Sequence, residues 1–239
     1  MNTIKIKKGR VKMIAHRGLS GLERENTLAA FIAGGNRSFY GMECDIHKTK
    51  DGEFVVIHDY DTKRVAGVEK AVQESTLEEL RKVHLYDLVD GIPKSHLIIP
   101  TLEEYLNISI KYDKVCVIEF KGTFEKDDLN RVLGIVEEKK YLHKCIFISF
   151  AIENLLYLRS VNKKVKLQFL TSKYDSEVLK TLIDNKLDID INYNTLTKEI
   201  ADELKNNKIK INVWTVDNPA VAEKLLSFGV DFITTNILE

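Results

Sequence analysis

The sequence predicts an α/β fold, a TIM (β/α)8 barrel in which eight parallel strands alternate with helices. Eight short β-rich runs lie between residues 12 and 235, and helical stretches that open on capping residues or proline separate them. A further observation concerns linkers. The 239 residues include three prolines, twelve glycines and no Pro-rich or Ser/Gly-rich stretch, so we expect a single domain over residues 1–239.

The strands and helices follow one another in a regular order. We expect strands near residues 12–16, 41–48, 114–121, 145–150, 165–170, 187–192, 209–215 and 231–235. We expect helices at residues 27–33, 102–111, 127–140, 152–161, 176–185, 198–206 and 219–228. Because each helix joins one strand to the next, the strands should be parallel and should close into a barrel.

Two departures from an ideal barrel are expected. Residues 60–100 form a small insertion after the second strand, with a short capped helix at residues 75–81. The sequence stops at Glu239, soon after the last expected strand, so the final helix should be truncated or missing. Neither departure excludes the barrel.

Composition limits the kinds of partner. Lys plus Arg and Asp plus Glu both number 36, so the chain has no overall charge that would favour nucleic acid, and we expect no stable membrane association. The insertion contains no long apolar or basic amphipathic segment, and no run of about 18 apolar residues occurs. The three cysteines, an odd number, are expected to be buried free thiols. We expect a cytoplasmic protein.

The most chemically dense stretch is residues 41–59. Side chains on a strand alternate faces, so Glu43 and Asp45 share a face and Cys44 points the other way. A divalent ion bound by oxygens would relieve the repulsion between the two carboxylates, although such a pair can also be a solvated strand edge. A turn at Asp51-Gly52 and a β-rich run at residues 54–57 then return the chain, so that His58 should lie near the carboxylates.

Other polar residues fall where a barrel builds its site, at the C-terminal ends of strands. They are His16 after the first strand, Glu119 and Lys121 on the third, and Trp214 on the seventh. We therefore expect these side chains to lie near Glu43 and Asp45.

The motifs together resemble the glycerophosphodiester phosphodiesterase family. They are His16-Arg17-Gly18, Glu25-Asn26-Thr27, Glu43-x-Asp45, Thr49-Lys50-Asp51-Gly52, His58-Asp59, Glu119-x-Lys121 and Trp214-Thr215. The resemblance implies a barrel with a small insertion after the second strand. It also implies hydrolysis of glycerophosphodiesters, such as glycerophosphocholine and glycerophosphoethanolamine, to sn-glycerol 3-phosphate and an alcohol, with calcium or magnesium as cofactor.

The resemblance also implies roles. It makes Glu43, Asp45 and Glu119 the metal ligands and His16 and His58 the acid–base pair. The chemistry agrees, because carboxylate oxygens suit a hard cation that neutralises phosphate charge. Imidazoles titrate near neutral pH, so one histidine can accept a proton while the other donates one to the leaving alcohol.

Three further residues are expected to contact the substrate. Arg17 and Lys121 offer positive charge to the phosphate, and Trp214 offers an apolar face to the glycerol carbons. Each has a structural alternative, since the two cations could be rim charges and the tryptophan could pack in the core. His47 shares a face with Glu43 and is expected to support the site rather than to bind the metal.

Two positions in the motifs stay open or depart from the family pattern. In Glu25-Asn26, the glutamate contacts the site or the asparagine caps the following helix. Arg24 stands where the family often has proline, which puts substrate preference in doubt. Phe120 replaces an aliphatic residue and should point towards the helices.

Two alternatives to this function remain open, a lysophospholipase D acting on lipids with the same barrel and a catalytically inactive phosphodiester-binding protein. The motifs contain no obvious Ser, Thr or Cys nucleophile, because Cys44 and Cys116 should face away from the site. We therefore favour attack by the substrate's own 2-hydroxyl, which gains from proximity, over direct attack by water.

Overall fold

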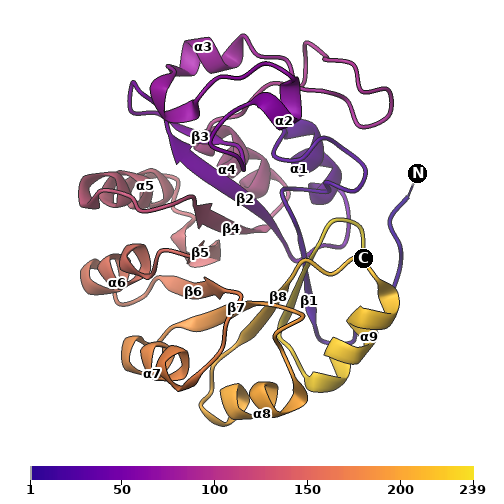
Figure 1. Cartoon of the computed structure of the whole chain (residues 1–239), viewed down its shortest axis with the longest axis vertical. Helices are drawn as coiled ribbons and strands as arrows, with labels where there is room; N and C mark the ends of the chain where they lie inside the picture. Colours follow the sequence, from indigo (N-terminus) through magenta and orange to yellow (C-terminus); the bar gives the residue numbers. More distant parts are fainter. Residues whose placement is uncertain (1) are drawn as a thin grey trace.

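The computed structural model describes residues 2–239, and its centre is a closed barrel of eight parallel strands (Figure 1). The strands are β1 (Lys12–Ala15), β2 (Gly41–Lys48), β4 (Val115–Phe120), β5 (Cys145–Ser149), β6 (Lys166–Thr171), β7 (Asp188–Asn192), β8 (Ile211–Trp214) and β9 (Phe232–Thr235). The barrel closes because β1 pairs with both β2 and β9. The predicted fold class is confirmed.

The helices surround the barrel, as Figure 1 shows. They are α1 (Leu28–Gly35), α4 (Leu102–Lys111), α5 (Lys126–Glu138), α6 (Ile152–Val161), α7 (Ser176–Asn185), α8 (Lys198–Asn206) and α9 (Pro219–Phe228), with a 3-10 turn, η2 (Leu142–Lys144), before β5. Capping explains several starts: Thr101 and Glu104 form a capping box at α4, and Asn218 caps α9 ahead of Pro219. Within residues 2–239, every helix is too short or too polar to cross a membrane.

The side chains of the barrel strands point alternately outward, towards the helices, and inward, into the barrel. Outward-facing residues of the strands pack against the helices and form the main core, which includes the free, buried thiols Cys44, Cys116 and Cys145. Phe120 belongs to the same core, as its strand position predicts. A smaller apolar cluster fills the inside of the barrel. At the C-terminal end of the barrel, the inward positions include the buried charged residues Glu43, Asp45 and Glu119 beside apolar members of this cluster such as Ile148 and Leu170.

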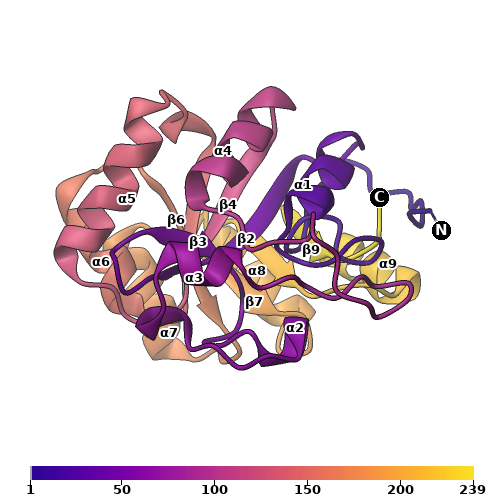
Figure 2. The ribbon, with the colours of Figure 1, turned by 90° about the horizontal axis from the view of Figure 1, so that it is seen from above.

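The insertion after β2 begins with a short strand that lies outside the barrel. β3 (Phe54–Val56) pairs antiparallel with β2, and the chain then forms α2 (Lys63–Ala66), the 3-10 turn η1 (Val72–Glu74) and α3 (Leu77–Arg81) before it reaches α4. Buried residues between 55 and 99 give the insertion a small core of its own. In Figure 2, β3, α2 and α3 lie in front of the barrel strands.

The two ends of the described chain pair with each other. Residues 236–239, all described, contain no helix. Instead Glu239 donates its backbone N–H to Ile4 at 2.8 Å, and Ile6 donates to Glu239 at 2.9 Å, so the two ends of the chain lie side by side.

Candidate active site

Three carboxylates lie together at the C-terminal end of the barrel. Glu43 and Asp45 project inward from β2, and Glu119 projects inward from β4, where it is the register partner of Asp45. One oxygen from each side chain lies within 4.8 Å of the other two. The residues are only 2%, 1% and 8% exposed, so water cannot screen the repulsion between their charges.

Two cations contact this cluster. Arg17, just after β1, donates its backbone N–H to Glu43 at 2.8 Å, and its Nε lies 3.3 Å from Asp45 Oδ2. Lys121, just after β4, has its Nζ 2.8 Å from Glu119 and 3.4 Å from Asp45. Within this group of five side chains, three carboxylates face two cations.

The carboxyl groups differ electrostatically. Burial acts to raise the pKa of Asp45, but the charges of Arg17 and Lys121 outweigh it and lower that pKa to about 2. Burial, followed by the charge of Asp45, raises the pKa of Glu119 to about 7. Burial and its acidic neighbours also raise the pKa of Glu43 well above the usual range. The cluster is therefore short of positive charge around Glu43 and Glu119.

A divalent cation fits these residues. Glu43 Oε1 is buried and accepts no hydrogen bond from any described residue. Such an orphaned oxygen in a native structure calls for a partner. Calcium and magnesium bind carboxylate oxygens, and a cation among these three groups would supply the missing charge.

His16 is held by a neutral amide. Its Nδ1 lies 2.7 Å from Asn236 Oδ1, and Asn236 donates from Nδ2 to Asp217 at 2.6 Å. Because a carboxylate only accepts, this bond fixes the amide with its oxygen towards His16, so Nδ1 carries the hydrogen and Nε2 is left free. Burial, followed by the charge of Arg17, lowers the pKa of His16 to about 4.

His58 is held by a carboxylate instead. Its Nδ1 lies 2.6 Å from Asp59, which also accepts from Arg64 Nε at 2.6 Å. Arg64 forms two hydrogen bonds with Glu25, at 2.8 and 2.7 Å, and Glu25 accepts from Arg17 at 2.8 Å. A continuous network thus joins His58 to the guanidinium of Arg17 beside the carboxylates.

The residues that were open in the sequence take supporting positions. Asn26 donates from Nδ2 to Asp45 at 2.8 Å and does not cap α1, whose N-cap is Thr27. The alternative that Asn26 caps the helix is therefore wrong. His47 is fully buried, with Nε2 3.2 Å from the backbone oxygen of His58, so it supports the segment that carries His58.

The first site loop also depends on its backbone. Arg17 and Gly18 have φ values of 53° and 74°, in the left-handed region that favours glycine. A Cβ atom on Gly18 would lie 2.6 Å from the backbone of Ala30 in α1. The Arg-Gly pair therefore lets the loop turn tightly over the helix and present Arg17 to the carboxylates.

A cavity of about 100 Å³ joins these groups. Among the residues that line it are His16, Arg17, Glu43, His58, Glu119, Lys121, Asp190 and Trp214. Trp214 donates its indole N–H to the backbone oxygen of Asp190 at 3.2 Å, and its ring meets Phe150 edge to face. Seven of the eight site residues expected from the sequence therefore line one cavity, and the eighth, Asp45, is buried beside it.

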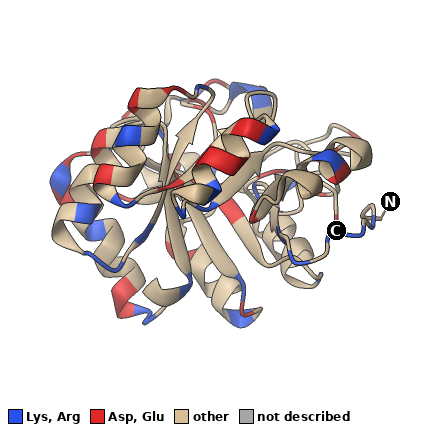
Figure 3. Cartoon of the chain, turned by 90° about the horizontal axis from the view of Figure 1, so that it is seen from below, with Lys and Arg blue, Asp and Glu red and all other residues tan. Residues whose placement is uncertain are grey.

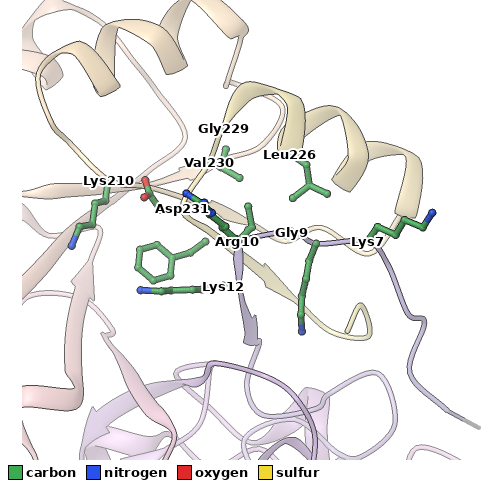
Figure 4. Close-up of a pocket in the computed structure, with 12 residues that line it drawn as sticks. Lys7, Gly9, Arg10, Lys12, Lys210, Leu226, Gly229, Val230 and Asp231 are labelled. Atoms are coloured by element: carbon green, nitrogen blue, oxygen red, sulfur yellow. The ribbon is translucent and has the colours of Figure 1, made fainter.

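A larger pocket, of about 430 Å³, lies at the opposite end of the barrel (Figure 4). Lys7, Arg10, Lys12 and Lys210 surround it, with Asp231 beside them. It lies at the N-terminal ends of β1, β8 and β9, where barrels do not place catalytic groups.

Several residues of the site were not found from the sequence. They are Arg64, Asp190, Asp217 and Asn236. Asn26 belongs to a motif named from the sequence, but its hydrogen bond to Asp45 was not expected. Asn236 could have been predicted, because it directly follows the last barrel strand, and site residues gather at the C-terminal ends of such strands. Arg64 offers no such signal, since it comes from the insertion.

Two histidines beside a set of carboxylates that suits a divalent cation are equipped to cleave phosphate esters, which places the chain among the phosphoric ester hydrolases. Comparison with known proteins identifies the family within this class. Residues 16–239 match the glycerophosphoryl diester phosphodiesterase family, and the chain belongs to it. It is an enzyme that hydrolyses glycerophosphodiesters.

Relatives and solved structures agree with this assignment. A glycerophosphodiester phosphodiesterase of Caldanaerobacter subterraneus is 30% identical over 230 residues, which cover 94% of this chain and 93% of the relative. The structure of a glycerophosphodiester phosphodiesterase from Thermotoga maritima, 27% identical, covers 95% of each chain with a TM-score of 0.76. A phosphodiesterase of Oleispira antarctica, solved with the product sn-glycerol-3-phosphate, shares the fold at 22% identity, with a TM-score of 0.86 over 94% of this chain and 92% of that chain.

Proposed function

We propose that this enzyme hydrolyses small glycerophosphodiesters, such as glycerophosphocholine and glycerophosphoethanolamine, to sn-glycerol 3-phosphate and an alcohol, with calcium or magnesium as cofactor. The observation that carries the proposal is the cluster of Glu43, Asp45 and Glu119, with its orphaned oxygen, beside two histidines on one small cavity. The product found in the Oleispira antarctica structure supports the substrate class. A cytoplasmic location stays a prediction.

The metal would be held by Glu43, Asp45 and Glu119. When bound, it would neutralise negative charge on the phosphate and so favour attack at phosphorus. Arg17 and Lys121 are the phosphate-binding residues in this proposal, because their positive charges already face the same carboxylates.

The histidines are proposed to divide acid and base roles according to their partners. A neutral amide holds His16, which leaves its Nε2 free to take a proton. A carboxylate, Asp59, holds His58 and can stabilise a protonated ring. We therefore propose His16 as the base and His58 as the acid in the first step.

The first step in this proposal is cyclisation. His16 removes the proton from the substrate's 2-hydroxyl, whose oxygen then bonds to phosphorus while the bond from phosphorus to the leaving alcohol breaks. His58 gives its proton to that alcohol. In the second step His58 takes a proton from water, which opens the cyclic phosphate, and His16 returns its proton to the 2-oxygen.

Trp214 is proposed to contact the glycerol carbons. Its ring lines the cavity, and its indole N–H is already bonded to the backbone of β7, so the ring face is oriented before substrate arrives. The ring also packs against the apolar cluster inside the barrel, which holds it in place.

Cyclisation can be tested with an altered substrate. A glycerophosphocholine analogue that lacks the 2-hydroxyl should bind to the enzyme but be hydrolysed more slowly by a factor of about 10² or more. Hydrolysis of that analogue at the normal rate would favour direct attack by water.

One observation keeps a second function in view, lysophospholipase D activity. The insertion exposes Leu88, Val89 and Ile92, and Val89 is 78% exposed, which could meet an acyl chain. Purified enzyme should be assayed for sn-glycerol 3-phosphate from glycerophosphocholine and, in parallel, for choline from lysophosphatidylcholine. We expect the first product to dominate, and choline from the lysolipid as the main product would replace the proposal by the second function. No turnover of either compound would leave only a binding protein.

A further inference from the structure

One buried acidic side chain at the cavity has no role in the proposed reaction. Asp190 lies in the middle of β7 and is 2% exposed. Its neighbours Ile189 and Ile191 pack outward into the main core, so Asp190 points into the barrel, where it lines the cavity.

The surroundings of Asp190 do not satisfy its carboxyl group. Its Oδ1 atom receives no hydrogen bond from the described residues, and none of their cationic side chains lies within 4.0 Å of it. Nearby polar groups inside the barrel do find partners. Asn212 donates to Gln168 at 3.3 Å and accepts from Thr234 at 3.2 Å. Unlike these inward polar residues of β6, β8 and β9, Asp190 on β7 has a carboxylate oxygen without a hydrogen-bond partner.

An unsatisfied buried polar group lowers stability, so its presence beside a cavity suggests a partner supplied by a ligand. The partner should be neutral, because the phosphate is expected on the side of Arg17 and Lys121 and would repel a carboxylate. The cavity has room for about three water molecules, which suits a small polyol fragment. A glycerol hydroxyl meets both conditions.

We propose that Asp190 determines specificity for the glycerol moiety, by a hydrogen bond between its carboxyl group and a glycerol hydroxyl. The inference rests on the proposed function and deepens it. A site that hydrogen-bonds a substrate hydroxyl rejects an analogue that lacks it, because the protein group is then left unpaired. Asp190 would therefore separate glycerophosphodiesters from phosphodiesters of simpler alcohols.

The test is a comparison of ligands in wild-type and variant enzymes. Binding of sn-glycerol 3-phosphate, 2-hydroxypropyl phosphate and 3-hydroxypropyl phosphate is measured by calorimetry with the divalent cation present. Asp190→Ala should weaken binding of sn-glycerol 3-phosphate roughly tenfold but change the affinity for the analogue that lacks the contacted hydroxyl by less than about twofold. Asp190→Asn, which can still hydrogen-bond, should recover part of the loss.

Stability provides a second readout. Because Asp190 is unsatisfied without ligand, Asp190→Ala and Asp190→Asn should leave the Tm of the free enzyme unchanged or raise it. Asp188→Asn is the matched control, since Asp188 points inward on the same strand but bonds the backbone of Lys210 instead of lining the cavity. Its affinities for all three ligands should match those of the wild type.

Three results would overturn the inference. In the first, Asp190→Ala weakens the binding of all three ligands equally. In the second, it weakens the binding of none. In the third, it lowers the Tm of the free enzyme but leaves the ratio of the three affinities unchanged. A variant that affects only glycerophosphocholine and not sn-glycerol 3-phosphate would place Asp190 at the head group, which also contradicts it. If wild-type enzyme released no sn-glycerol 3-phosphate from glycerophosphocholine, the proposed function itself would fail.

Discussion

At the scale of single residues, the proposal depends on two histidines with different partners. His16 faces the amide of Asn236, and His58 faces the carboxylate of Asp59. The two rings line the same cavity, so both can reach one phosphate ester. Each ring would move a proton in the same reaction, so the effects of replacing them should not be additive.

We predict that His16→Ala and His58→Ala each lower kcat by about 10² to 10⁴, the usual contribution of a positioned acid or base. The double variant should lose little more than either single variant, because both residues act on one reaction coordinate. Steady-state kinetics with glycerophosphocholine provide the measurement. A single variant with near wild-type kcat would remove that histidine from the mechanism.

Glu25 gives a prediction about pH and stability. Burial opposes ionisation of Glu25, but its hydrogen bonds and charge interactions with Arg64 and Arg17 prevail and lower its pKa to about 2. A lowered pKa in the folded state stabilises the protein above the ordinary pKa, and this contribution is lost as pH falls from about 4.5 to 2. Wild type should therefore exceed Glu25→Gln in free energy of unfolding by roughly 1–3 kcal/mol at pH 7.

Urea denaturation at several pH values measures this difference. It should shrink as the pH falls below about 4.5, because wild type then loses the charge that the variant lacks. Glu23→Gln serves as control, since Glu23 forms no ion pair with the residues described, and it should match wild type at pH 7. A difference that stays constant down to pH 2 would refute the electrostatic explanation.

At the scale of elements, the insertion does more than lengthen the chain. It builds a small core of its own and sends Arg64, from α2, to bridge Asp59 after β3 and Glu25 after β1. The insertion thereby fixes the loop that carries His58 against the loop that carries Arg17. Its contribution to the site is orientation.

Arg64→Ala should therefore lower kcat/KM about 10- to 100-fold, the usual effect of removing a group that orients site residues. Lys63→Ala is the matched control on the same helix, because Lys63 pairs with the exposed Glu69 and not with Asp59 or Glu25. Equal kinetics for the two variants would show that the bridge is dispensable.

Strand alternation predicts much of this site from the sequence. Glu43, Asp45 and Glu119 can be placed together because parallel strands of a barrel end at one face. Arg64 cannot be placed that way, since the path of the insertion follows from its packing. The same limit holds for Asp190, whose lack of a partner depends on its neighbours on β6 and β8.

At the scale of the whole molecule, a net charge of zero conceals a separation of charge. In Figure 3, basic and acidic residues are mixed over the outer helices. The loops at the N-terminal end of the barrel are mainly basic. Those loops and the first residues of the strands that follow them carry Lys5, Lys7, Lys8, Arg10, Lys12, Arg37, Lys114, Lys139, Lys140, Lys144, Lys163, Lys164, Lys166, Lys186, Lys208 and Lys210, against Asp113, Asp188, Asp231 and Glu239, which pairs with Lys5. The overall composition therefore does not reveal this separation of charge.

We propose that the barrel and insertion form one domain.

The larger pocket at that basic end gives a control for the placement of the site. Arg10→Ala and Lys210→Ala should change kcat/KM by less than about twofold, because barrel enzymes react at the opposite face. Kinetics with glycerophosphocholine test this directly. A large loss in either variant would move the active site, or part of it, to the N-terminal end.

The central claim is that the three-carboxylate cluster supports metal-dependent hydrolysis of glycerophosphodiesters. Its most direct test is the rate of sn-glycerol 3-phosphate release from glycerophosphocholine before chelation, after exhaustive chelation, and after calcium or magnesium is restored. We predict that chelation abolishes the activity of the wild type and that the cation restores it, whereas Glu43→Gln and Asp45→Asn bind the cation weakly and stay inactive. Undiminished release after exhaustive chelation would contradict the claim.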